Sequence, residues 1–301
     1  MTNLPSPPRL RPLGKSGIEV SGLAWGMWRF AGTPDEGLRL IEAALDSGIN
    51  FFDTADIYGF NGTDGFGDAE TLLGRILSAN PSLRGKMVLA SKGGIIPPRP
   101  YDSSAGYLTA AIDASLARLG TDVLDLWQVH RPDILTHPHE LAETLHRAVK
   151  AGKVRALGVS NYTLPQIKAL QSFLDLPLAS TQPEISPLCL APVENGELDM
   201  AMQHNLTVMA WSPLGGGRIA DPGSAREHAV AAALDTVAEA QGATRTAAAY
   251  SWLMAHPAGI IPIVGTQNPG RIAEAAAAYD ITWTRNDWYD VLVASRGENL
   301  P

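Results

Sequence analysis

Cysteine, long apolar runs and an export signal are features that this sequence lacks or nearly lacks. Its 301 residues include one cysteine, Cys189, so the chain cannot form an internal disulfide, which is typical of proteins from a reducing compartment. No segment approaches the ~18 unbroken apolar residues of a membrane span, and the N-terminus has no basic stretch followed by an apolar core. We therefore expect a cytoplasmic protein that does not enter a membrane.

Positive charge is scarce as well. The chain has 23 Lys and Arg against 31 Asp and Glu, which gives a formal net charge of −8. This balance argues against nucleic acid or an anionic membrane surface as the main partner. Hydrophobic residues make up 45% of the chain and charged residues 18%, which excludes a disordered chain and a coiled coil. We expect a globular monomer whose partner is a small molecule.

Short apolar runs of strand length alternate with amphipathic stretches of helix length along most of the chain. The apolar runs cover 23–27, 49–54, 87–91, 124–129, 154–159, 179–183, 206–211 and 260–264. The helical stretches cover 34–47, 68–79, 104–119, 137–151, 163–174, 194–204, 226–241 and 269–279. Eight β-then-α repeats of this kind predict a closed (β/α)8 TIM barrel, in one domain over residues 1–301. An open doubly wound sheet is the alternative if two of these strands are wrong.

Three segments fall outside the eight repeats. Residues 9–20 contain two short extended pieces around a Gly-Lys-Ser-Gly turn, which predicts a hairpin before the first barrel strand. Residues 244–255 predict an extra helix before the eighth strand, and residues 285–294 predict a final helix. In that last helix Trp288, Val291 and Leu292 recur at helical spacing, so we expect them to pack on the outside of the barrel.

Polar and charged residues stand where the predicted strands end. The second, third and fourth strands end at Asp53, Lys92 and His130. The next three end at Ser160 and Asn161, at Gln182, and at Trp211 and Ser212. In a (β/α)8 barrel these ends converge on one face, where active sites are built. A single Asp or His there is most often a structural residue, but three successive strands that deliver Asp, Lys and His predict an active site.

Tyr58 follows Asp53 by five residues, and a loop that folds back over the barrel rim would bring its phenol beside Lys92. A free phenol has a pKa of about 10 and is a poor acid at neutral pH. A nearby ammonium stabilises the phenolate, so we expect a lowered pKa for Tyr58, with Asp53 paired to Lys92 to keep the lysine charged. Such a tunable proton donor suits the reduction of a carbonyl to an alcohol.

Six short motifs occur at these strand ends. They are Asp53-Thr54-Ala55-x-x-Tyr58-Gly59, Ser91-Lys92, His130-Arg131-Pro132-Asp133, the stretch 152–161, Gln182 and Ser212-Pro213-Leu214. In this order the motifs resemble those of the aldo-keto reductases, NAD(P)H-dependent barrel enzymes that reduce aldehydes and ketones. The resemblance extends from residue 9 to about residue 280. The loop Gly215-Gly216-Gly217-Arg218 is similar to that of a bacterial subgroup of uncertain substrate.

The resemblance implies a role for each residue of the site. Tyr58 would be the general acid, tuned by Lys92 and Asp53, and His130 would hydrogen-bond the carbonyl oxygen. The residues implied at the nicotinamide are Gly26, Met27, Trp28, Asp53, Ser160, Asn161, Gln182 and Trp211, of which Trp211 would stack on the ring. Those implied at the pyrophosphate are Ser212, Leu214, Gly216 and Arg218.

The choice of cofactor depends on the eighth repeat. The resemblance implies that Gly265, Thr266, Gln267, Arg271 and Glu274 lie at the adenosine end. A planar forked donor such as Arg271 suits the 2′-phosphate of NADPH, and the N-terminus of the following helix would add donors. Many relatives have Lys in place of Gly265 and Asn in place of Ala275. We expect NADPH as the cofactor, with NADH possible.

Gln128 departs from the family pattern, because relatives usually carry an apolar residue there. Strand alternation places Gln128 on the same face as His130, one layer deeper in the barrel. A buried amide needs hydrogen-bond partners. We therefore expect a polar network or an ordered water beneath the site.

Two other functions compete with carbonyl reduction. A metal-dependent hydrolase could use His130 together with His137, His139 and His146, but the last three lie off the strand ends and no acidic cluster completes a metal shell. We therefore expect no metal site. A non-catalytic nucleotide-binding regulatory subunit is the second rival, because a fold does not fix a function. The sequence leaves the carbonyl substrate open.

Overall fold

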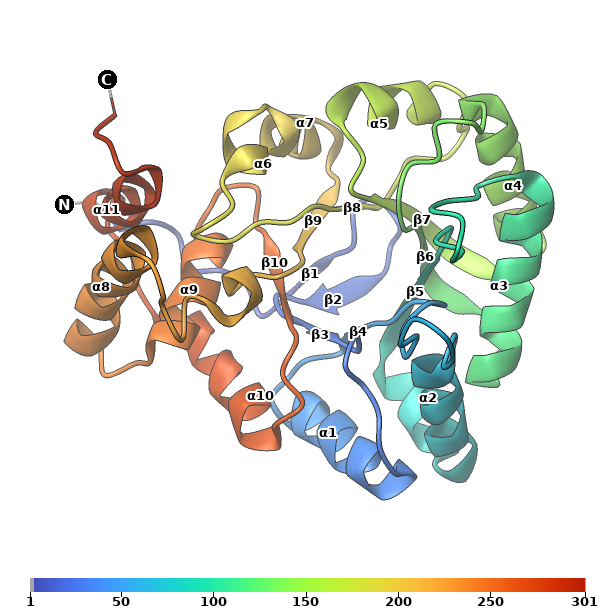
Figure 1. Ribbon diagram of the computed structural model, residues 1–301, viewed down its shortest axis with the longest axis horizontal. Coiled ribbons are helices and arrows are strands. Elements are labelled where there is room, and N and C mark those ends of the chain that lie inside the picture. The colour runs from blue at the N-terminus through green and yellow to red at the C-terminus, as the bar shows by residue number, and fades with distance from the viewer. Residues whose placement is uncertain (1–2, 301) are drawn as a thin grey trace.

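The computed structural model describes residues 3–300 of the chain. Within them, eight parallel strands close into one barrel, and helices surround it (Figure 1). Around the barrel the strands are β3 (Ala24–Gly26), β4 (Phe51–Asp53), β5 (Val88–Gly93), β6 (Leu124–Val129), β7 (Val154–Ser160), β8 (Ser180–Gln182), β9 (Thr207–Ala210) and β10 (Ile261–Val264). Strand β10 pairs with both β9 and β3, which closes the ring. The predicted (β/α)8 barrel is confirmed.

Several strands are shorter than the apolar runs that predict them. The run 49–54 yields only the three residues of β4, although Ile49 before it is also buried. The run 179–183 likewise yields only β8. Apolar character reports burial on both faces, whereas a strand also needs ladder hydrogen bonds to its neighbours. The runs therefore locate the strands correctly and overestimate the length of several of them, whereas β5 and β7 extend beyond their runs.

The helices cover the barrel from outside. They are α1 (Pro34–Asp46), α2 (Asp68–Ala79), α3 (Ala105–Leu119), α4 (Pro138–Lys150), α5 (Leu164–Gln171), α6 (Ala191–Glu194), α7 (Glu197–His204), α8 (Ala225–Ala240), α9 (Arg245–Met254), α10 (Pro269–Ala275) and α11 (Arg285–Arg296). Local sequence sets many of their starts: Thr33, Ser224 and Thr284 each form a capping box with an acidic residue three positions later.

Two predicted helices differ from what the structure has. The stretch 194–204 contains the last residue of α6 and the whole of α7, which begins later than expected because Gly196 adopts a φ of 84°, a left-handed conformation that suits glycine. The stretch 269–279 is α10 followed by a 3-10 turn, Ala276–Asp280.

The N-terminal hairpin closes one end of the barrel. Its strands β1 (Leu10–Pro12) and β2 (Glu19–Ser21) pair antiparallel, as predicted. Leu13 and Ile18 are buried in the cluster that fills the barrel interior. The backbone N–H of Gly14 donates to Thr207 Oγ1 over 2.8 Å, at the residue where β9 begins. The hairpin therefore covers the N-terminal strand ends and leaves the opposite end for a site.

An outer layer is built from α8, α9 and α11, which lie together near both chain ends in Figure 1. The rings of Trp252 and Trp288 stack with centroids 4.7 Å apart, and each indole N–H donates to the other residue's carbonyl over 3.0 Å. Trp288, Val291 and Leu292 are all buried, which confirms the predicted packing of the final helix.

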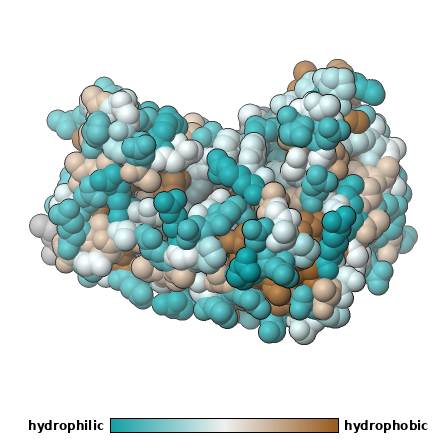
Figure 2. Space-filling model, turned by 60° about the horizontal axis from the view of Figure 1, so that its bottom comes forward, coloured by the Kyte–Doolittle hydropathy of each residue, from teal (hydrophilic) through white to brown (hydrophobic). Residues whose placement is uncertain are grey.

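No helix in the described part of the chain combines the length and the apolar character that a bilayer crossing requires. On the face shown in Figure 2, hydrophilic residues predominate and hydrophobic ones lie scattered among them.

The expectation of a single domain stays a prediction.

Candidate active site at the carboxyl ends of the barrel strands

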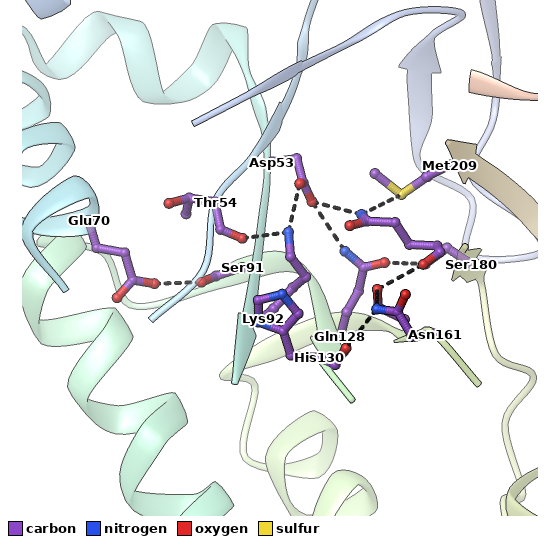
Figure 3. A network of polar contacts seen from close by, with 12 residues as sticks. Asp53, Thr54, Glu70, Ser91, Lys92, Gln128, His130, Asn161, Ser180 and Met209 are labelled. Carbon is purple, nitrogen blue, oxygen red and sulfur yellow. Dashed lines mark hydrogen bonds and ion pairs between the residues drawn. The ribbon is translucent and has the colours of Figure 1, made fainter. Parts of the chain in front are cut away.

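Asp53 and Lys92 form a buried ion pair where β4 and β5 end. Lys92 Nζ donates to Asp53 Oδ2 over 2.6 Å and to the Thr54 carbonyl over 2.9 Å (Figure 3). The two side chains are 0% and 2% exposed. A buried charge is costly unless it is paired and hydrogen-bonded, and both conditions hold here. The expected pair is present.

The second oxygen of the Asp53 carboxylate is bound by two amides. Asp53 Oδ1 accepts from Gln128 Nε2 over 3.3 Å (Figure 3). It also accepts from Gln182 Nε2 over 3.0 Å. The polar network expected around Gln128 therefore exists. Gln182, which the resemblance places at the nicotinamide carboxamide, already uses its amide nitrogen on Asp53.

Tyr58 lies on the loop that follows β4 and turns back over the rim. Its backbone N–H donates to the Ala55 carbonyl over 3.1 Å, which sets the turn. Lys92 Nζ lies 5.1 Å from the centroid of the Tyr58 ring, and the His130 ring centroid lies 5.9 Å away. The loop thus brings the phenol beside the lysine, as the sequence predicts.

The expected direction of the Tyr58 pKa is wrong. Burial raises the pKa of the phenol, and Lys92 opposes this rise without reversing it. The reason is that the partly buried phenolate loses some of its water, while the charge of Lys92 is shared with Asp53, whose own charge also raises the pKa of Tyr58. In this structure Tyr58 is a weaker acid than a free phenol.

Lys92 is charged at neutral pH, whereas His130 is neutral. Burial alone would lower the pKa of Lys92, but Asp53 and Tyr58 raise it above its ordinary value, so the ammonium persists at neutral pH. Burial, together with the charges of Lys92 and Arg131, holds the pKa of His130 well below its usual range. His130 is therefore a neutral imidazole, and its Nδ1 has no hydrogen-bond partner among the described residues.

The rim from β7 to β9 is a chain of polar contacts. Ser160 Oγ donates to the Gln182 carbonyl over 2.8 Å, and Asn161 Nδ2 donates to Ser160 Oγ over 2.8 Å. Asn161 Oδ1 in turn accepts from Trp211 Nε1 over 2.9 Å.

The residues at the end of β3 lie on the other side of the mouth. Gly26 ends β3, and Met27 is buried. Trp28 is 68% exposed, with its ring centroid 5.8 Å from that of Tyr58. The structure brings these residues together at one end of the barrel.

The loop after β9 is shaped by glycines. Ser212 has a φ of 50° and begins a turn that continues past the half-buried Leu214 into a 3-10 turn over Gly215–Gly217. A Cβ on Gly216 would meet nothing within 4 Å, so the backbone there borders open space. Arg218 folds back, donating from Nε to the Gly215 carbonyl over 2.7 Å and pairing with Glu227 over 3.4 Å.

The segment after β10 faces the same end. The carbonyl of Thr266 accepts from Trp25 Nε1 over 3.1 Å, and Gln267 Nε2 donates to the Gly26 carbonyl over 3.5 Å. These bonds fix the segment against β3. A Cβ on Gly265 would again meet nothing within 4 Å.

Helix α10 offers fewer backbone donors than expected. Proline at position 269 has no N–H, and the N–H of Arg271 is taken by Asn268 Oδ1 over 3.1 Å. The Arg271 side chain is exposed, and its guanidinium has no hydrogen-bond or ion-pair partner within residues 3–300. Glu274 accepts from Thr244 Oγ1 over 2.5 Å and so ties α10 to α9. The guanidinium, rather than the helix end, is the group available to an anion.

The sequence analysis assigned no role to Glu70 or to Arg131, although Arg131 stands in one of the six motifs. Arg131 lies directly after His130, and its guanidinium carbon is 5.7 Å from the Trp211 ring centroid, so it adds positive charge at the mouth. Glu70 is fully buried on α2, where it accepts from Ser91 Oγ over 2.5 Å and pairs with Arg118 over 2.7 Å. The sequence signal for Arg131 is a charged residue directly after the His that ends a strand. The signal for Glu70 is an acidic residue on the apolar face of a helix.

The four histidines considered for a metal site do not assemble one. Nδ1 of His137 accepts from the His139 backbone N–H, and Nε2 of His146 accepts from the Asp175 N–H over 3.0 Å. Both lie at or on α4, outside the barrel. Within the described residues, no three His, Cys, Asp or Glu side chains are grouped as metal ligands.

Comparisons with known proteins agree on the family. The family model described as "Aldo/keto reductase family" matches residues 22–292. A "6-dehydroglucose reductase" of Novosphingobium aromaticivorans is 65% identical over 100% of both chains. Another, of Agrobacterium fabrum, is 37% identical over 94% of this chain and 97% of that one.

Solved structures agree on the fold. The glycerol dehydrogenase of Gluconobacter oxydans has a TM-score of 0.81 at 26% identity, covering 99% of this chain and 97% of that one. A thermostable aldo-keto reductase solved with the inhibitor epalrestat has a TM-score of 0.82 at 23% identity, covering 95% and 99%. The second likeness concerns the fold alone.

Proposed function

This chain belongs to the aldo/keto reductase family, and on that premise we propose that it reduces an aldehyde to a primary alcohol with NADPH. The observation that carries the proposal is the buried Asp53–Lys92 ion pair beside the Tyr58 phenol. A fixed ammonium next to a phenol stabilises the phenolate that remains after a proton has been given away. That is the requirement for protonating a carbonyl oxygen as it becomes an alkoxide.

Each residue of the site has a step to perform. Tyr58 donates its proton to the carbonyl oxygen, and Lys92 stabilises the resulting phenolate while Asp53 keeps the ammonium in place. His130, neutral because of its lowered pKa, can donate a hydrogen bond to the same oxygen without repelling Lys92. Because burial raises the pKa of Tyr58, the phenol stays protonated at neutral pH and ready to donate.

The residues around the mouth fit a nicotinamide dinucleotide. The guanidinium of Arg271, which has no partner among the described residues, suits a 2′-phosphate, and the open space at Gly216 and Gly265 lets the backbone approach a phosphate closely. When bound, NADPH supplies the hydride that the carbonyl carbon receives. Ser160 and Asn161 present hydroxyl and amide groups for the carboxamide, and Trp211 presents an aromatic face for the nicotinamide ring.

The aldehyde that we propose is the terminal one of 6-dehydroglucose. Two relatives that match nearly the whole chain, at 65% and 37% identity, carry the name 6-dehydroglucose reductase. Reduction at C6 adds one hydride to carbon and one proton to oxygen, which gives glucose. The exposed ring of Trp28 beside Tyr58 supports a sugar, because an aromatic face can pack against the C–H face of a hexose.

Purified protein should be tested for NADPH oxidation with 6-dehydroglucose and a panel of simple aldehydes, each repeated with NADH. We expect turnover with 6-dehydroglucose at a kcat/KM above that of the simple aldehydes, with glucose as the product. Tyr58→Phe serves as the matched control, because it keeps the ring and removes the proton. If NADPH binds and no carbonyl compound is reduced, the reductase proposal fails and the non-catalytic nucleotide-binding function takes its place.

A further inference from the structure

Gln128 lies in a single layer of residues that crosses four neighbouring strands. Strand pairing sets Lys92 opposite Gln128, Gln128 opposite Gly158, and Gly158 opposite Ser180. Lys92, Gln128 and Ser180 are all 0% exposed. Gln128 therefore lies directly beneath the candidate active site, with Lys92 on one side of it and Gly158 on the other.

Gly158 makes room for a contact between its two neighbours. A Cβ at this position would overlap Ser180 Oγ and would lie 3.1 Å from Gln128 Cγ. Because the backbone of Gly158 is not left-handed, the requirement for glycine is one of space. Through that space Ser180 Oγ reaches Gln128 Oε1 over 3.3 Å.

The Asp53 carboxylate fixes which way the Gln128 amide faces, and the Ser180 hydroxyl holds the other end of the amide. An ionised carboxylate only accepts hydrogen bonds, so Nε2 is directed at Asp53 Oδ1, 3.3 Å away, and the Ser180 hydroxyl, which can donate or accept, donates to Oε1 (Figure 3). Asp53 then has both amide donors on Oδ1 and the Lys92 ammonium on Oδ2. All three donors come from different strands, so the carboxylate cannot rotate without breaking at least one bond.

We infer that Gln128 is a positioning residue for the proton donor, which acts on Tyr58 through Asp53 and Lys92. The inference rests on the proposed function, because it concerns the same proton. The charged groups that face the phenol are Lys92, Asp53 and Arg131, and His130 beside it is neutral. Lys92 and Arg131 favour the phenolate, and Asp53 opposes it.

Gln128 weakens that opposition. An amide N–H that donates to Oδ1 offsets part of the carboxylate charge and keeps Oδ2 turned to Lys92. With an apolar side chain at position 128, Oδ1 would keep only the Gln182 donor. The phenol would then face a less compensated negative charge and would release its proton less readily.

The first test replaces Gln128 by the apolar residue of similar size, Gln128→Leu. We expect kcat for aldehyde reduction to fall roughly 10-fold, the effect of one hydrogen bond to a charged group. We expect KM and the NADPH dissociation constant to stay within about twofold. Thr181→Val is the matched control, because Thr181 is a buried hydroxyl on β8 that contacts Glu197 instead of Asp53. It should leave kcat unchanged.

The second test restores the donor in a form that titrates. In Gln128→Glu, a protonated carboxyl can donate to Asp53 as the amide does, whereas the ionised form would repel it. Its kcat should approach the wild-type value at acidic pH and fall as the pH rises, while wild type stays constant over that range. A merely space-filling role for Gln128 predicts that Gln128→Leu is as active as Gln128→Glu at acidic pH, and that result would overturn the inference.

The third test needs no turnover. Tyrosines are replaced by 3-fluorotyrosine, whose more acidic phenol titrates at milder pH, and the ¹⁹F resonance of Tyr58 is assigned by its loss in Tyr58→Phe. The titration midpoint should move to higher pH in Gln128→Leu and, by a smaller amount, in Ser180→Ala. Ser180→Ala also replaces Gln128→Leu if the latter does not fold.

The ¹⁹F titration separates the inference from the proposed function. If wild type reduces no aldehyde and the midpoint still moves, the reductase proposal fails and the positioning role stands. If aldehydes are reduced and neither kcat nor the midpoint changes in the folded variants, Gln128 only fills space and the inference is overturned.

Discussion

The floor of the candidate site and its outer end differ in how their polar groups are partnered. At the floor, Asp53, Lys92 and Gln128 are buried and bonded to one another. At the outer end, Arg271 is exposed without a side-chain partner among the described residues, and Gly265 faces open space. Buried charges need fixed partners and exposed ones do not.

This difference indicates two separate tasks. The floor is assembled before any ligand arrives, as preorganised catalysis requires, whereas the outer end is left for a ligand to complete. Substitutions at the floor should therefore change the rate, and substitutions at the outer end should change cofactor affinity. Five variants test this division.

The largest effect is expected from Tyr58→Phe. The variant keeps the ring and loses the proton, so kcat should fall about 10²- to 10⁴-fold, the usual contribution of a general acid. The NADPH dissociation constant, measured by tryptophan fluorescence quenching, should hardly change because Arg271 lies at the other end of the site. A kcat near that of wild type would show that another group protonates the carbonyl.

Lys92→Met should reduce kcat by about 10²-fold and also destabilise the fold. Removing one partner of a buried ion pair typically costs about 3–5 kcal/mol, and the amides of Gln128 and Gln182 should keep the loss at the lower end. Urea unfolding measures the stability and NADPH oxidation measures the rate.

The double variant Lys92→Met/Asp53→Asn separates these two effects, because asparagine removes the charge and keeps an amide oxygen that can accept from Gln128 and Gln182. Without either charge, the stability should return toward that of wild type while activity stays lost. If the double variant is less stable than Lys92→Met, the pair is not the source of the destabilisation, and the floor is held by something other than charge pairing.

The sequence predicts the buried contacts of Asp53, Lys92 and Gln128 at the floor of the site because they depend on the barrel topology. Apolar runs locate the barrel strands, and a barrel forces their ends together, so the meeting of Asp53 and Lys92 follows from topology alone. The buried amide at Gln128 predicts a network because unpartnered polar groups are costly inside a protein. These inferences depend on which strand carries a residue, and the pattern gives that directly.

What sequence missed depends on balances and distances that no pattern contains. Burial raises the pKa of Tyr58 and the charge of Lys92 lowers it. The sequence motif shows that a lysine is present but does not show how deeply the phenol is buried. The hydrogen bond from the Arg271 backbone N–H to Asn268 Oδ1 and the late start of α7 at Gly196 are local features that a helical sequence pattern does not predict. The first of these removes a backbone donor that was expected for the cofactor.

Arg271→Ala tests the outer end. If the guanidinium holds the 2′-phosphate, the NADPH dissociation constant should rise about 10- to 100-fold, and that for NADH should change little. Added salt should weaken NADPH binding to wild type more than NADH binding, because only NADPH carries the extra phosphate. Equal losses for both cofactors would mean that Arg271 is structural, and the NADPH preference would be withdrawn. The kcat at saturating cofactor should stay near wild type, in contrast to the floor variants.

The smallest effect is expected from Gly265→Lys, and its sign is the informative part. A Cβ at Gly265 meets nothing within 4 Å and the backbone is not left-handed, so a side chain can be added without strain. A second cation near Arg271 should lower the NADPH dissociation constant by a few-fold, since an exposed charge pair contributes about 0.2–1 kcal/mol. NADH affinity and kcat at saturation should not change, and Gly265→Gln controls for the added bulk. If Gly265→Lys weakens the binding of both cofactors, the open space at Gly265 is needed by the dinucleotide itself, and the outer end is set by shape rather than by charge.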